Sequence, residues 1–158
     1  MNKEFKELIE KSKESLEKIE KRVEEGSEEL SEDAKEYWHE LKSYLGNVKT
    51  KLQNAYESFE GETELKTHLL LMEAKEKVEE VKDDMDSFLA NVTRKGEKEL
   101  DIMALKAHLA KLDAEDKWKE KEKEFSHLYA KSKLEAEKLA QKAGKEINDI
   151  FLKLTEIV

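Results

Sequence analysis

The chain has 158 residues, of which 44% are charged and 37% hydrophobic, and it contains no Pro, no Cys and only 5 Gly. So few turn-forming residues exclude loop-rich β-sandwiches and barrels, and the missing Cys excludes disulfides and thiolate metal sites. The net charge of −9 is spread along the chain without a basic segment, so we expect no nucleic-acid partner.

Three glycines, Gly26, Gly61 and Gly96, lie at intervals of 35 residues and are expected to end helices. Glycine readily adopts the left-handed conformation that commonly follows the last helical residue. The apolar periodicity continues through Gly46 and Gly144, which we therefore place inside helices. These positions predict one domain over residues 1–158, with helices at about 2–25, 28–60, 63–95, 97–130 and 133–157.

Apolar residues alternate at intervals of three and four along the first three helices, which is typical of amphipathic α-helices. From Ala34 to Phe59 the repeat is a strict heptad, and a strict heptad favours left-handed, coiled-coil-like packing. In the first helix the stripe comprises Phe5, Ile9, Ser12, Leu16, Ile19 and Val23. The predicted core of the second and third helices includes Trp38, Leu41, Leu45, Val48, Leu52, Val78, Val81, Met85 and Phe88.

The fourth predicted helix has two apolar stripes, which predicts contacts with more than one neighbouring helix. This pattern favours a bundle over an isolated two-stranded coiled coil. One stripe comprises Leu100, Met103, Ala107, Ala110, Ala114 and Trp118, and the other comprises Ile102, Leu105, Leu109 and Leu112.

A helix break is expected near Ser132, because Ser132 and Glu135 match a capping box. A last amphipathic stripe follows this break. The alternative to a break is one continuous helix over 97–158. The fold class predicted by all these patterns is all-α, an antiparallel bundle of four or five long amphipathic helices with coiled-coil-like heptad packing. The last stripe comprises Ala136, Leu139, Ala143, Ile147, Ile150, Leu154 and Ile157.

No membrane-spanning or secretory segment is expected. The longest wholly apolar run covers residues 69–72, whereas a membrane span needs about 20 residues. The first residues also lack the apolar region of a signal peptide. We therefore expect a cytoplasmic protein.

Residues 65–74 and 105–114 share Leu, Lys, His, Leu and Ala at matching positions. The block ELKTHLLLMEAKEKVEEVKDDMDSF, followed by MALKAHLAKLDAEDKWKEK, resembles a family of small bacterial coiled-coil proteins, some of them labelled stress-induced. Residues 31–42 resemble the Trp-bearing amphipathic helix of that family, although here this helix precedes the hairpin. The resemblance covers about residues 31–130 and implies a helical hairpin without a specific function.

A turn at Gly96 would make the flanking helices an antiparallel hairpin in which paired residue numbers add to about 192. This register places His108 near Asp84, and His68 opposite Glu124. Imidazole, thioether and carboxylate ligands suit Cu²⁺ or Zn²⁺. The alternative is that the ring of His68 packs beside the apolar seam. The candidate metal ligands are His68, Met72, Glu124 and His127.

Two Glu-x-x-His pairs, Glu36 with His39 and Glu124 with His127, have the spacing found in di-iron bundles. Glu36 and His39 lie off the apolar stripe of their helix, on its solvated side, so we expect no di-iron centre. The sequence also lacks a nucleophile elbow and a phosphate-binding glycine loop, and we expect no catalysis and no cofactor.

The function that these features favour is that of a non-enzymatic structural or protein-interaction bundle, which associates with itself or with a partner helix. The alternative function is reversible binding of its amphipathic helices to a lipid surface. Polar faces poor in net positive charge disfavour that alternative, because anionic lipids would gain little electrostatic attraction.

Overall fold

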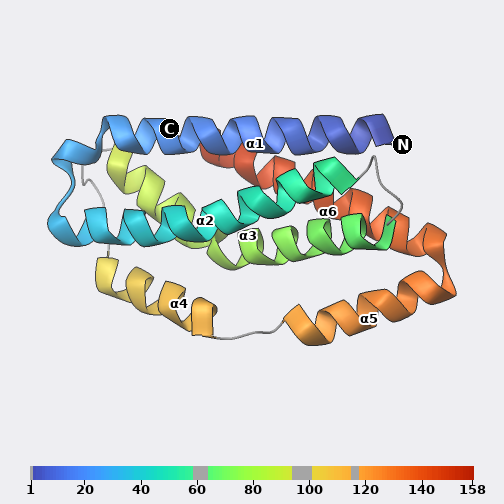
Figure 1. Ribbon diagram of the computed structural model, residues 1–158. Coiled ribbons are helices and arrows are strands. Elements are labelled where there is room, and N and C mark those ends of the chain that lie inside the picture. Colours follow the sequence, from blue (N-terminus) through green and yellow to red (C-terminus); the bar gives the residue numbers. More distant parts are fainter. Residues whose placement is uncertain (1, 59–63, 94–100, 115–117) are drawn as a thin grey trace.

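The computed structural model describes residues 2–58, 64–93, 101–114 and 118–158, and these are all-helical, without a strand (Figure 1). The all-α prediction is therefore confirmed. The helices are α1 (Asn2–Glu25), α2 (Glu32–Ser58), α3 (Glu64–Thr93), α4 (Ile102–Ala114), α5 (Trp118–Lys131) and α6 (Lys133–Ile157), with a short 3₁₀ helix, η1 (Ser27–Glu29), between α1 and α2.

Four long helices, α1, α2, α3 and α6, lie alongside one another, and α6 packs against both α1 and α3 (Figure 1). Helices α1, α3 and α6 run in one direction, whereas α2, α4 and α5 run in the other. Helix α4 lies on the outside against α2 and α3, and α5 lies on the outside against α3 and α6. No helix among the described residues has an apolar stretch long enough to cross a membrane.

The predicted core of the second and third helices is confirmed, since all nine of its side chains are buried. Trp38 is 6% exposed and the other eight are 1% exposed or less. Their apolar stripes face inward because the three-four alternation keeps one side of each helix apolar. In the first helix, the described members of the stripe are buried as well: Ile9, Ser12, Leu16, Ile19 and Val23.

The glycines differ in part from the prediction. Helix α1 ends before Gly26, whose N–H donates to the carbonyl oxygens of Arg22 and Val23. The φ of Gly26 is −95°, so the predicted left-handed conformation is wrong at this position. Gly46 and Gly144 lie inside α2 and α6, as predicted. Gly61 and Gly96, and with them the expected turns, lie outside the described residues.

The prediction of a single helix over 97–130 is wrong, because the structure has two helices there, α4 and α5. The buried stripe of α4, formed by Leu105 and Leu109, would continue at residues 116, 119 and 120. Those residues are Asp116, Lys119 and Glu120, and a straight helix would direct them toward the core. The described residues thus form six α-helices, where four or five were predicted.

The predicted break at Ser132 is confirmed. Helix α5 ends at Lys131, and the extended backbone of Ser132 caps α6, with its side chain accepting the N–H of Glu135 at 3.2 Å. This cap satisfies one of the N–H groups left open at the start of a helix. The alternative of one helix over 97–158 is therefore wrong.

The two apolar stripes of the predicted fourth helix differ in exposure along α4. Met103 is 64% exposed, and Ala107 and Ala110 are exposed as well. Helix α4 lies on the outside of the molecule, so only the stripe containing Leu105 and Leu109 is covered. The prediction that this segment contacts more than one neighbouring helix is nevertheless confirmed, since α4 packs against both α2 and α3.

Candidate binding groove

The junction of α4 with the long helices follows the predicted hairpin register. His108 Nδ1 lies 2.5 Å from Asp84 Oδ2, and their residue numbers add to 192. Lys106 Nζ lies 3.0 Å from Glu36 Oε2 and links α4 to α2. The predicted proximity of His108 and Asp84 is therefore confirmed.

The junction of α5 with α3 has a shifted register. Lys121 Nζ lies 2.5 Å from Glu76 Oε1, and these residue numbers add to 197. The register therefore differs by about five residues between α4 and α5. The sequence could not show this shift, because it depends on where each of the two helices packs against α3.

His68 packs against aromatic rings of α5. It is 5% exposed, and its ring meets those of Phe125 and Tyr129 edge-on, at centroid distances of 6.4 Å and 5.9 Å. This arrangement agrees with the alternative in which the imidazole packs at the apolar seam. Glu124, the predicted neighbour across the hairpin, is exposed beside this contact.

The four candidate metal ligands are brought together only in part. Met72 and Glu124 line one groove, whereas His127 is exposed and lies about 200° around α5 from Phe125. Among the described residues, no group of three or more His, Cys, Asp or Glu side chains is placed to hold a metal ion. The four-residue metal site stays a prediction, and it would require α5 to turn about its axis.

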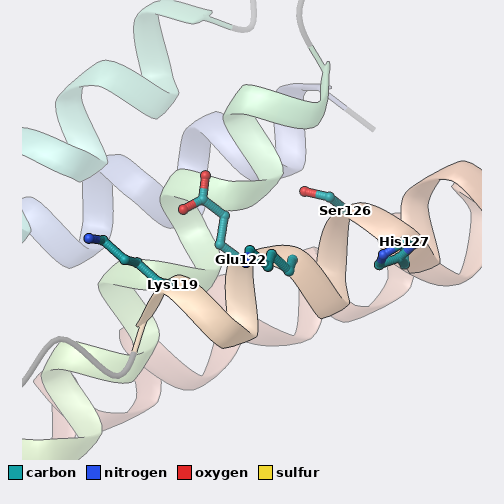
Figure 2. Close-up of a pocket in the computed structure, with 5 residues that line it drawn as sticks. Lys119, Glu122, Ser126 and His127 are labelled. Carbon is teal, nitrogen blue, oxygen red and sulfur yellow. The ribbon is translucent and has the colours of Figure 1, made fainter.

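His127 belongs instead to a second pocket of about 550 Å³ on the surface of α5. Figure 2 shows its imidazole ring on this helix together with the side chains of Lys119, Glu122 and Ser126. The described residues that line this pocket all come from α5.

A groove of about 340 Å³ lies where α3, α5 and α6 meet. Its apolar residues come from all three helices, and charged residues stand at its rim. We call it the α5 groove and define it by Met72, Lys75, Glu76, Trp118, Lys121, Glu124, Phe125, Leu128 and Leu139.

The helix break at Ser132 makes this groove, because it folds α6 back along α5 (Figure 1). Leu128 before the break and Leu139 after it therefore line the same space. Leu139 belongs to the apolar stripe predicted for the last helix, yet it is 40% exposed. The groove could not be predicted from the sequence, because its residues lie on three helices. The one signal in the sequence was Trp118 at the start of a highly charged segment.

Both lysines of the α5 groove are paired with carboxylates. Lys121 pairs with Glu76, and Lys75 Nζ lies 2.9 Å from Glu146 Oε2. Partial burial opposes the charge of Lys75, but the hydrogen bond to Glu146 and the nearby Glu79 outweigh it, so the pKa of Lys75 lies above its ordinary value. The positive charges of the groove are thus already neutralised.

The two Glu-x-x-His pairs do not converge. Glu36 and His39 are exposed on α2, and Glu36 pairs with Lys106. Glu124 and His127 lie on the outer part of α5.

Comparison of the chain with protein-family models, with curated proteins and with solved structures finds no match.

Proposed function

We propose that this protein is a non-enzymatic helical bundle that acts by protein–protein association through the outward face of α4. The observation that carries the proposal is the composition of this face, which consists of Met103, Ala104, Ala107 and Ala110, all exposed. In a chain with 44% charged residues, four exposed uncharged residues on one short helix are unusual. A solvent-exposed apolar face is typical of an interaction surface.

The partner that fits this face is a second copy of the same chain. Two α4 helices packed antiparallel, about a two-fold axis near residue 106, would place Asp101 of one copy beside Lys111 of the other. Both side chains are exposed and have opposite charges. The small side chains of Ala107 and Ala110 would let the two backbones approach closely, with Met103 covering the end of the contact.

The four long helices would support the outward face of α4. Helices α1, α2, α3 and α6 form a bundle with coiled-coil-like heptad packing, in which α2 runs antiparallel to the other three (Figure 1). Burial of the heptad positions of α2 supports this packing, from Trp38 through Leu45 to Leu52. A rigid bundle would hold the outward face of α4 in one orientation.

Sedimentation equilibrium of wild type and of an Ala107→Glu variant tests the proposal. The wild type should approach twice the chain mass of 18.5 kDa as concentration rises, and the variant should stay monomeric. A Leu152→Glu variant is the matched control, since it adds the same charge at an exposed leucine of α6. A monomeric wild type, or a dimeric Ala107→Glu variant, would contradict the proposal.

Flotation with vesicles of anionic phospholipid separates association from lipid binding. We expect the protein to remain with the soluble fraction. Flotation of the wild type that is lost in the Ala107→Glu variant would instead assign the face of α4 to a lipid surface.

A further inference from the structure

The α5 groove has the size of a small-ligand site. Its volume of about 340 Å³ lies at the lower end of the range for such pockets, and it is too small to enclose a helix about 10 Å across. Two aromatic rings, those of Trp118 and Phe125, and the thioether of Met72 line it. Such surfaces favour contact with the face or edge of another aromatic ring.

The charges at the rim of the groove select among aromatic ligands. The ammonium groups of Lys75 and Lys121 are paired with Glu146 and Glu76. Glu124 is exposed at the rim, and its carboxylate has no ion-pair partner among the residues that the structure describes. The groove thus combines an apolar floor with one uncompensated negative charge.

We propose that the α5 groove binds an aromatic molecule that carries one positive charge. A body of one or two rings lies against Trp118 and Phe125, and the cationic group lies beside the carboxylate of Glu124. An anionic aromatic molecule would place like charges together, and a neutral one would lack the ion pair. This site is separate from the outward face of α4, so it does not depend on self-association.

Isothermal titration calorimetry with three probes of one shape tests the charge preference. The probes are 1-naphthylmethylammonium, 1-naphthylmethanol and 1-naphthoate, added to the wild-type chain at neutral pH. We expect the cation to bind about tenfold more tightly than the alcohol, and the anion to bind most weakly. Naphthoate binding as tightly as the cation would overturn the proposal, as would the absence of heat with all three probes.

Two glutamates of α5 provide a matched pair of variants. Glu124→Gln should abolish the preference for the cation and leave the affinity for the alcohol unchanged. Glu122→Gln should preserve that preference, because Glu122 lines the second pocket (Figure 2). An equal loss in both variants would mean that the net charge of α5, and not a site, attracts the cation, and would overturn the proposal.

Two leucines of α6 test the apolar part of the groove. Leu139→Ala should weaken all three probes, whereas Leu152→Ala, at a leucine that does not line the groove, should weaken none. Circular dichroism of each variant shows that the helices are retained. Binding that is unchanged in Leu139→Ala would place the probes elsewhere and overturn the assignment.

Discussion

The ring of Phe88 on α3 stacks on the indole of Trp38 on α2, with centroids 6.1 Å apart and planes 7° from parallel. Tyr37 meets the same phenyl ring edge-on at 5.2 Å. Three aromatic side chains therefore join α2 to α3 near the end where α4 packs. Aromatic pairs of this kind stabilise beyond the apolar area that they bury.

Shortening a side chain in the heptad core should cause a large loss of stability. Leu45 is fully buried on α2, and Leu45→Ala should lower the free energy of unfolding by about 2–5 kcal/mol, because it leaves a cavity. Leu152→Ala is the control, at a leucine that is 45% exposed, and should cost less than about 0.5 kcal/mol. Urea denaturation followed by circular dichroism measures both, and equal losses would contradict the heptad assignment.

Two tyrosines of α2 predict opposite effects of removing a hydroxyl group. The Tyr37 hydroxyl is buried and has no hydrogen-bond partner among the residues that the structure describes, and burial, then the charges of Asp84 and Glu40, raise its pKa. The Tyr44 hydroxyl donates to the carbonyl oxygen of Lys77 at 3.0 Å. Tyr37→Phe should therefore raise the free energy of unfolding by about 1 kcal/mol, and Tyr44→Phe should lower it by about 1 kcal/mol.

Denaturation of these two variants under the same conditions provides the comparison. The substitutions remove the same atom from the same helix, so differences in helix propensity cancel. A similar loss in both variants would show that the Tyr37 hydroxyl has a partner, such as a buried water molecule.

Gly46 predicts a stabilising substitution. It lies inside α2, and a Cβ atom added there would meet nothing within 4 Å. Gly46→Ala should raise the free energy of unfolding by about 1 kcal/mol, because alanine loses less conformational entropy in a helix. Gly26→Ala lies outside a helix and should gain less, and thermal melts of the two variants would show the difference. An unchanged melting temperature in Gly46→Ala would contradict the placement of Gly46 in a helix.

The candidate metal site predicts a negative result in calorimetry. Because His127 lies on the outer side of α5, we expect no heat from Zn²⁺ or Cu²⁺ added at neutral pH. A metal bound at this site would raise the melting temperature, because it would bind the folded chain more tightly than the unfolded one. Binding that is weakened by both His68→Ala and His127→Ala would show that the two histidines share a metal.

Helix type, most helix ends and the buried stripes of the long helices could be predicted from the sequence, because these features depend on local chemistry. The three-four alternation determines which side of a helix is apolar, and Ser132 with Glu135 determines a helix start. The proximity of His108 and Asp84 could also be predicted from the sequence, because the position of one turn determines which residues of a hairpin lie opposite each other.

The break between α4 and α5, the exposure of Met103 and the α5 groove depend on the tertiary structure. An apolar stripe does not show whether a neighbour covers it, so Met103 and Leu139 resembled core residues in the sequence. Whether such a residue is buried depends on which helices the chain brings alongside it. The periodicity of the chain therefore determines the helices and their apolar sides, whereas the packing of six helices determines which of those sides remain open to a ligand or a second chain.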